Sequence, residues 1–123
     1  MDYFWQQVEL SQWSFPGYYS IERKEKKMFN DLDPILHSQL RLSIVSILMT
    51  VDEANFTFIK ETTNAAAGNV SIQIKKLQDA GYVKVKKTFK NNYPNTTVSL
   101  TKKGIEAFED YVNNLKKYIN PKK

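Results

Sequence analysis

Eight lysines between residues 67 and 104 are the feature of the sequence with the clearest chemical meaning. Asp79 is the one acidic residue in that stretch, so it carries a net charge of +7 in a chain whose overall charge is +5. Within it, residues 69–76 read NVSIQIKK and combine amide, hydroxyl and ammonium groups. Ammonium groups bind phosphates, whereas amides and hydroxyls also form hydrogen bonds with base edges. The stretch therefore indicates a nucleic-acid-binding surface, with a solvated lysine-rich surface as the alternative.

Other kinds of chemistry have little support in the sequence. The chain has no cysteine and one histidine, which excludes disulfides and makes a zinc site unexpected. It contains no paired acids, nucleophile motif or glycine-rich phosphate loop, so we expect neither an enzyme nor a cofactor. No apolar run approaches the roughly 20 residues that span a bilayer, and no signal peptide is evident. We expect a cytoplasmic protein that does not act at a membrane.

The residues from Ala67 to Gly81 are predicted to form a helix that positions these groups. Val70, Ile74 and Leu77 recur at i, i+4 and i+7, which predicts one apolar stripe for packing. The remaining sides of the helix are polar or cationic. The residues predicted there to contact DNA are Asn69, Ser71, Ile72, Gln73, Lys75 and Lys76.

Two shorter elements are predicted to precede this helix. Asp33 and Pro34 form a helix-start signal, as N-cap and first helical residue, for a helix on which His37 and Arg41 lie one turn apart. We interpret both of these side chains as structural tethers. After it, Asn55-Phe56 is predicted to add a short strand to a small sheet.

A second helix is predicted from Phe58 to Thr63. Thr57 is its predicted N-cap, and Phe58 and Ile59 are expected to point inward. Asn64 tolerates the left-handed conformation that ends a helix, so the chain can turn at once into the lysine-bearing helix. Two helices joined by so short a turn, the second longer and more basic, are typical of a helix-turn-helix.

A β-hairpin and a last helix are predicted to follow. Tyr82–Phe89 alternates with period two, Lys90–Asn95 has the composition of a turn, and Thr96–Leu100 returns as the second strand. Thr101 is the predicted N-cap of a helix from Lys102 to about Ile119. The hairpin residues predicted to contact DNA are Lys87, Lys90, Asn92, Tyr93 and Asn95.

The last helix carries a longer apolar stripe than one small domain needs, which suggests a homodimer; simple packing on its own core is the alternative. The residues predicted to form the dimer contact are Ile105, Phe108, Tyr111, Val112, Leu115, Tyr118 and Ile119. We divide the chain into an aromatic and charged N-terminal arm (1–27), a DNA-binding domain (28–104) and a C-terminal dimerisation helix (105–123). The purine-rich coding implied by Glu22–Lys27 also raises the hypothesis that Met28 is the natural start.

The order helix, short strand, helix, recognition helix, hairpin and helix is that of an α+β, mostly α, winged helix-turn-helix. The segments GNVSIQIKKLQDAGYVKVKK and LTKKGIEAFEDYV also resemble the small winged-helix regulators related to MarR and ArsR repressors. The resemblance covers about residues 32–118, and its most specific part is AGYV followed by Leu100-Thr101 and Gly104. It implies that the third helix enters the major groove, that the hairpin is a wing on the DNA backbone or minor groove, and that the last helix dimerises.

The sequence departs from this family at two places. Ala65–Ala67 stands where relatives have a hydroxyl or acid to cap the recognition helix, and no arginine lies in the wing. We therefore expect a helix start that frays until DNA binds, and wing contacts that depend less on salt.

The resulting hypothesis is a sequence-specific, double-stranded-DNA-binding transcriptional regulator that acts as a homodimer, with a small-molecule effector left open. The alternative is a winged helix used for protein–protein contact.

Overall fold

The structure, a computed structural model, describes residues 29–120 of the chain, which divides into two units, residues 1–30 and 31–123. The N-terminal arm therefore lies outside the described residues. The second unit holds the described helices and strands. Their bounds, in chain order, are α1 Gln39–Leu48, β1 Ala54–Asn55, α2 Phe56–Thr63, α3 Ala67–Asp79, β2 Val83–Lys90, β3 Tyr93–Leu100 and α4 Lys102–Ile119.

The first helix begins at Gln39, so the start predicted at Pro34 is wrong. Asp33 does cap a turn, because its Oδ1 accepts a hydrogen bond from the Ile35 N–H at 2.8 Å. That turn does not continue into a helix, since Ser38 is extended (φ −151°, ψ 129°). A capped turn and a break thus precede α1.

Helix α2 begins earlier than predicted because its N-cap is Asn55, not Thr57. The Asn55 Oδ1 accepts a hydrogen bond from the Phe58 N–H at 2.7 Å. In a helix that starts at Phe56, positions 56 and 59 share one side and position 58 lies opposite. Accordingly Ile59 is buried while Phe58 is 47% exposed, so the inward placement predicted for Phe58 is wrong.

The connections around α3 agree with the sequence prediction. Asn64 ends α2 in the left-handed conformation (φ 56°, ψ 36°), and two alanines lead into α3. Gly81, just beyond the other end of α3, has a φ of 82°, which a side chain would strain. The two helices therefore meet through the tight turn of a helix-turn-helix.

The three strands form one antiparallel sheet in the order β1-β3-β2. The hairpin turn is only Asn91-Asn92, with φ values of 54° and 67°, so the six-residue turn predicted at 90–95 is wrong. Two positive φ values are those of a type I′ turn, which asparagine tolerates. Pro94 fits within β3 because the short β1 reaches only Thr97 and Val98 and leaves that edge open.

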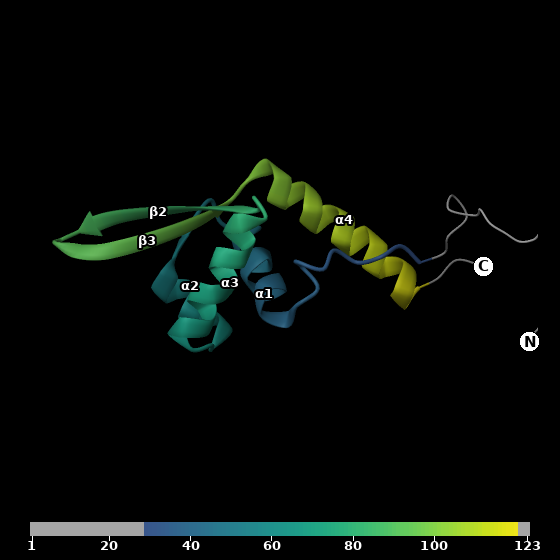
Figure 1. The fold of residues 1–123 in the computed structure, drawn as a ribbon, viewed down its shortest axis with the longest axis horizontal. Coiled ribbons are helices and arrows are strands. Elements are labelled where there is room, and N and C mark those ends of the chain that lie inside the picture. Colours follow the sequence, from purple (N-terminus) through teal and green to yellow (C-terminus); the bar gives the residue numbers. More distant parts are fainter. Residues whose placement is uncertain (1–28, 121–123) are drawn as a thin grey trace, which may run out of the picture. The chain divides into compact units, whose positions relative to one another are not determined.

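The core lies between the helices and the base of the hairpin. In Figure 1, α1, α2 and α3 gather at that base, the far end of the hairpin extends past them, and α4 leaves in another direction. This arrangement confirms the predicted winged helix-turn-helix. The buried apolar residues are Leu36, Ile44, Val45, Leu48, Ala54, Ile59, Val70, Ile74, Leu77, Val83, Val98 and Tyr111.

Candidate nucleic-acid interface

Helix α3 presents the expected polar surface. Val70, Ile74 and Leu77 are buried against the other helices, as the apolar stripe predicted. The sides of α3 that remain accessible carry most of the predicted DNA-contacting residues, and Ile72 is 56% exposed among them. An apolar side chain at such a position has the character needed to meet a thymine methyl group. The exposed residues of this set are Asn69, Ser71, Ile72, Lys75 and Lys76.

The N-terminus of α3 has no side-chain cap, as the three alanines led us to expect. Its N-cap is Ala66, whose carbonyl accepts the first helical hydrogen bond from Val70 at 3.0 Å. The first-turn N–H groups of a helix have no partner within the helix, and the helix dipole adds partial positive charge there. This end of α3 therefore suits a phosphate oxygen as its hydrogen-bond acceptor.

Gln73 is not free in the way the sequence suggested, because Arg41 of α1 holds it. The Arg41 Nη1 donates to the Gln73 Oε1 at 2.5 Å, and the Gln73 Nε2 donates to the Asn69 Oδ1 at 2.9 Å. Arg41 is itself fixed by its Nε, which donates to the Ile35 carbonyl at 2.6 Å. A glutamine that reads adenine uses both ends of its amide. Here the acceptor end is already engaged, and the chain of hydrogen bonds instead orients Asn69.

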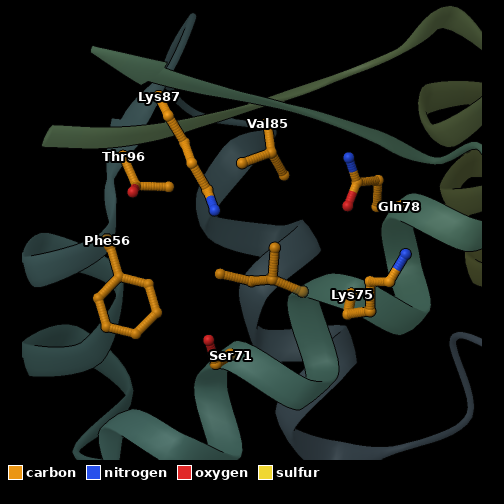
Figure 2. Close-up of a pocket in the computed structure, with 8 residues that line it drawn as sticks. Phe56, Ser71, Lys75, Gln78, Val85, Lys87 and Thr96 are labelled. Carbon is orange, nitrogen blue, oxygen red and sulfur yellow. The ribbon is translucent and has the colours of Figure 1, made fainter.

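A hollow of about 360 Å³ separates α3 from the sheet, and its rim is partly cationic. Figure 2 shows the Lys87 side chain extending from its strand into the hollow and the Ser71 hydroxyl facing it from α3. Lys75 pairs with Asp79 at 2.8 Å, but both side chains are more than half exposed. Such a pair contributes little, roughly 0.3–0.5 kcal/mol, so a phosphate can replace Asp79 as the partner of Lys75.

The register of the wing sorts its residues onto two faces. Directly opposite residues of an antiparallel pair point to the same side, and successive pairs alternate. The pairs Lys87–Thr96 and Phe89–Pro94 thus share a face with the core pair Val85–Val98, the face toward α3. Of the predicted wing residues, Lys87 lies on this face, Asn92 lies in the turn, and Lys90, Tyr93 and Asn95 lie on the other face.

Phe89 is a candidate interface residue that the sequence reasoning missed. Its side chain is 78% exposed at the far end of β2. The period-two alternation already placed Phe89 in line with Val83 and Val85, beyond the point where the core ends. Because the core ends before position 89, the sequence already indicated that this aromatic side chain would have no core residue to pack against.

The junction between α3, the wing and α4 is built around Tyr82. The Tyr82 hydroxyl donates to the Asp33 Oδ2 at 2.5 Å, and the Tyr82 carbonyl accepts from the Thr101 N–H at 3.0 Å. The Thr101 Oγ1 donates to the Gly81 carbonyl and accepts from the Gly104 N–H, which confirms Thr101 as the N-cap of α4. These bonds fix the direction of the wing relative to α3.

The pKa of Tyr82 gives a pH test of this junction. Burial first, and then the hydrogen bond to Asp33 and its charge, raise the pKa of Tyr82 from 10.0 to about 12. The folded state holds the phenol proton of Tyr82 more tightly than the unfolded state does. The protonated phenol therefore contributes fully to folding stability below pH 10, and this contribution is lost as the pH rises through about 12. We expect the ultraviolet difference titration of wild type against Tyr82→Phe to show one tyrosine with a midpoint near 12. A midpoint near 10 would contradict the burial of this phenol together with its bond to Asp33.

Helix α4 uses only part of its apolar surface within the domain. Tyr111 is 4% exposed, and its hydroxyl lies 3.0 Å from the Nδ1 of His37, which gives His37 the tethering contact expected of it. Phe108 and Leu115 are half-buried against the same core. Tyr111 is thus a core residue of its own domain, although its position in sequence placed it among the predicted dimer contacts.

The remaining apolar residues of α4 lie beside this buried face. Ile105 is 37% and Ile119 is 74% exposed, with the half-buried Val112 between them at a spacing of seven residues. Residues seven apart lie almost on one line along a helix. Tyr118 is 44% exposed near the C-terminal end. The apolar surface of α4 is therefore wider than the core covers.

Within residues 29–120 no helix has the length and apolar character to cross a membrane, and no three acidic or histidine side chains cluster as metal ligands would. Helix α3 and the wing face that carries Lys87 form a partly cationic surface of the described unit.

Residues 40–119 match the family model of a winged helix DNA-binding domain. The chain belongs to this family. It is 32% identical to an uncharacterized protein of Methanocaldococcus jannaschii over 78 residues, which cover 63% of this chain and 85% of that protein. A solved transcriptional regulator homologue from Pyrococcus horikoshii is 30% identical, with a TM-score of 0.66 over 70% of this chain and 85% of that one.

A more distant winged-helix structure shares only the fold with this chain. It is Escherichia coli MarR in a complex with operator DNA, with 14% identity and a TM-score of 0.57 over 70% of this chain and 61% of that one. The family membership makes the chain a DNA-binding regulator and confirms the resemblance on which the sequence prediction was based.

Proposed function

We propose that the chain is a sequence-specific transcriptional regulator that binds duplex DNA as a homodimer, with α3 in the major groove and the wing beside it. The observation that carries this proposal is the shared surface of α3 and the wing. Lys75 and Lys76 of α3 and Lys87 of the wing lie on it, around side chains able to contact base edges. Cations that surround such groups are typical of a protein that first holds the phosphates and then reads the bases.

In this proposal Asn69 and Ile72 are the main reading side chains of α3. Asn69 is exposed, and its Oδ1 accepts a hydrogen bond from Gln73, so its amide group is oriented before DNA arrives. Ile72 offers apolar contact to a thymine methyl group. Gln73 would orient Asn69 through their hydrogen bond. It would reach a base only after losing its own hydrogen bond to Arg41.

The wing and the α3 N-terminus supply phosphate contacts. Lys87 extends into the hollow between α3 and the sheet, where Ser71 lies on the opposite side (Figure 2). The uncapped first turn of α3 adds backbone N–H donors. Together they would hold a DNA strand whose bases face α3.

The proposed dimer contact is the part of α4 that the domain core leaves open, namely the line Ile105, Val112 and Ile119. Pairing of this line with that of a second copy would remove exposed apolar surface from water, at about 25 cal/mol per Å² buried. A symmetric dimer would then present two copies of α3 to successive major grooves, about 34 Å apart.

The affinity of the wild-type protein for duplex DNA as a function of salt tests the function itself. We expect log affinity to fall linearly with log salt concentration, with a slope of about −0.9 for each phosphate contact. An absence of duplex binding at about 50 mM salt would overturn the proposal. It would favour the alternative in which this surface contacts a protein.

The dimer is tested by Ile105→Glu combined with Ile119→Glu. We expect wild type to sediment as a dimer at micromolar concentration and the double variant as a monomer, because each copy would have to bury two carboxylates in the apolar interface. Asn113→Glu, on the exposed polar side of α4, is the control that should leave the dimer intact. A wild-type protein that sediments as a monomer, alone and with DNA, would disprove this part of the proposal.

A further inference from the structure

The far end of the wing carries an apolar pair that the domain itself does not cover. Phe89 and Pro94 lie directly opposite each other on β2 and β3, next to the turn. Phe89 is 78% exposed and Pro94 is exposed as well. Large exposed aromatic side chains at the end of a projecting element are characteristic of contact sites.

The face on which this pair lies restricts what it can contact. Phe89 and Pro94 follow Lys87 and Thr96 on the same side of the hairpin, the side that borders the hollow beside α3. If α3 enters a major groove, as proposed above, this side of the wing turns toward the same duplex. On the same face the wing carries Lys87, whose ammonium group can bind a phosphate beside a groove. Duplex DNA is therefore the occupant that the charges favour.

The chemistry of the pair differs from that of an arginine that enters a narrow minor groove. Residues 83–100 contain no arginine, so this kind of shape readout is not available to the wing. Phenylalanine and proline are instead among the residues that proteins insert as wedges between base steps from the minor groove, which kinks the duplex. The two-residue turn and the cross-strand pairing hold this pair in place before binding.

We propose that Phe89, supported by Pro94, is an apolar wedge that enters the minor groove beside the α3 site, partly unstacks a base step and bends the DNA. Pyrimidine–purine steps unstack most easily, so the wedge selects TA or CA/TG at a position that α3 does not touch. This inference rests on the proposed function and adds to it a second, indirect source of sequence preference.

The bend of the bound DNA tests the wedge. Duplexes carrying a dye at each end, with either TA or a stiff A-tract at the flanking step, report the bend by energy transfer in the presence of wild-type, Phe89→Ala or Thr88→Ala protein. Thr88 is the matched control, because it is exposed, adjoins Phe89 in β2 and lies on the opposite face of the same hairpin. Circular dichroism verifies that each variant is folded, which the exposure of both side chains leads us to expect.

We expect wild-type protein to bend the TA duplex by at least about 20° and to bind it more tightly than the A-tract duplex. Phe89→Ala should abolish the bend and weaken binding about tenfold, with the salt slope unchanged because every phosphate remains bound. Thr88→Ala should keep the bend. Wild-type protein that binds but leaves the DNA straight would overturn the wedge alone, as would a bend that Phe89→Ala retains. A failure of wild-type protein to bind any duplex would overturn the proposed function along with it.

Discussion

Replacement of Gly104 by alanine is expected to destabilise the domain by roughly 3 kcal/mol or more. The first turn of α4 runs so close to the start of the wing that a Cβ at this position would lie closer to the Tyr82 backbone than van der Waals contact allows, only 2.2 Å from its carbonyl oxygen and 3.0 Å from its carbonyl carbon. A backbone carbonyl cannot rotate away as the end of a side chain can. This one also accepts the hydrogen bond from the Thr101 N–H, so a shift would disturb the whole junction.

Gly68→Ala is the matched control, because a Cβ at position 68 would meet no atom within 4 Å. Gly68 lies in the first turn of α3, where alanine favours the helix, so this variant should be unchanged or stabilised by about 0.4–1 kcal/mol. The midpoint temperature of thermal unfolding, Tm, measures the stability of both variants. We expect Gly104→Ala to lower Tm by more than about 10 °C for a domain of this size. Equal Tm values for the two variants would show that the α4 junction is not packed as described.

Replacement of Lys75 and Lys76 together is expected to have the largest effect on DNA binding. Both are exposed on the side of α3 that faces away from the core. If both contact phosphates, Lys75→Ala with Lys76→Ala should weaken binding at about 0.1 M salt by at least about 100-fold for every sequence. The salt slope should fall by about one unit for each phosphate that the variant no longer binds.

The control is Lys116→Ala with Lys117→Ala, an adjacent pair of exposed lysines in the last turn of α4. It removes the same formal charge from a helix outside the proposed DNA interface. We expect the control to change affinity only slightly and to leave the slope almost the same. If the two double variants bound DNA with equally reduced affinity, general electrostatic attraction would account for binding and α3 would have no special role.

The parts of the fold that are determined by residues close together in the sequence were predictable. The stripe of Val70, Ile74 and Leu77 predicted α3, and Asn64 and Thr101 predicted where one helix ends and another begins. Each of these signals acts within about a turn of the chain. They were enough to predict the order of elements, and hence the winged helix-turn-helix.

The local signals were less reliable where two of them compete. Pro94 and the asparagines predicted a long turn, but Asn91 and Asn92 alone adopt positive φ, and the proline fits in the open part of β3. The strands therefore run to the Lys90–Tyr93 pair. As a result, Tyr93 lies in β3, and Phe89 lies next to the turn at the projecting end of the hairpin.

The candidate site was hardest to predict where partners are distant in sequence. Gln73 has the right type and position to read a base, but Arg41, 32 residues earlier, occupies its acceptor oxygen. Tyr111 lay at the edge of the predicted dimer stripe, whereas its contact with His37 and the core depends on how α4 packs against the segment that precedes α1. Periodicity defines which residues share a side of a helix, but not which side a neighbour covers.

Selection of binding sites from random duplex DNA by the wild-type protein tests the central claim most directly. If a dimer reads DNA through α3, the selected sites should share an inverted repeat, with half-site centres separated by about 10–10.5 base pairs or a multiple of this spacing. A selected pool in which no sequence is enriched over the starting pool would contradict the claim that this surface reads DNA.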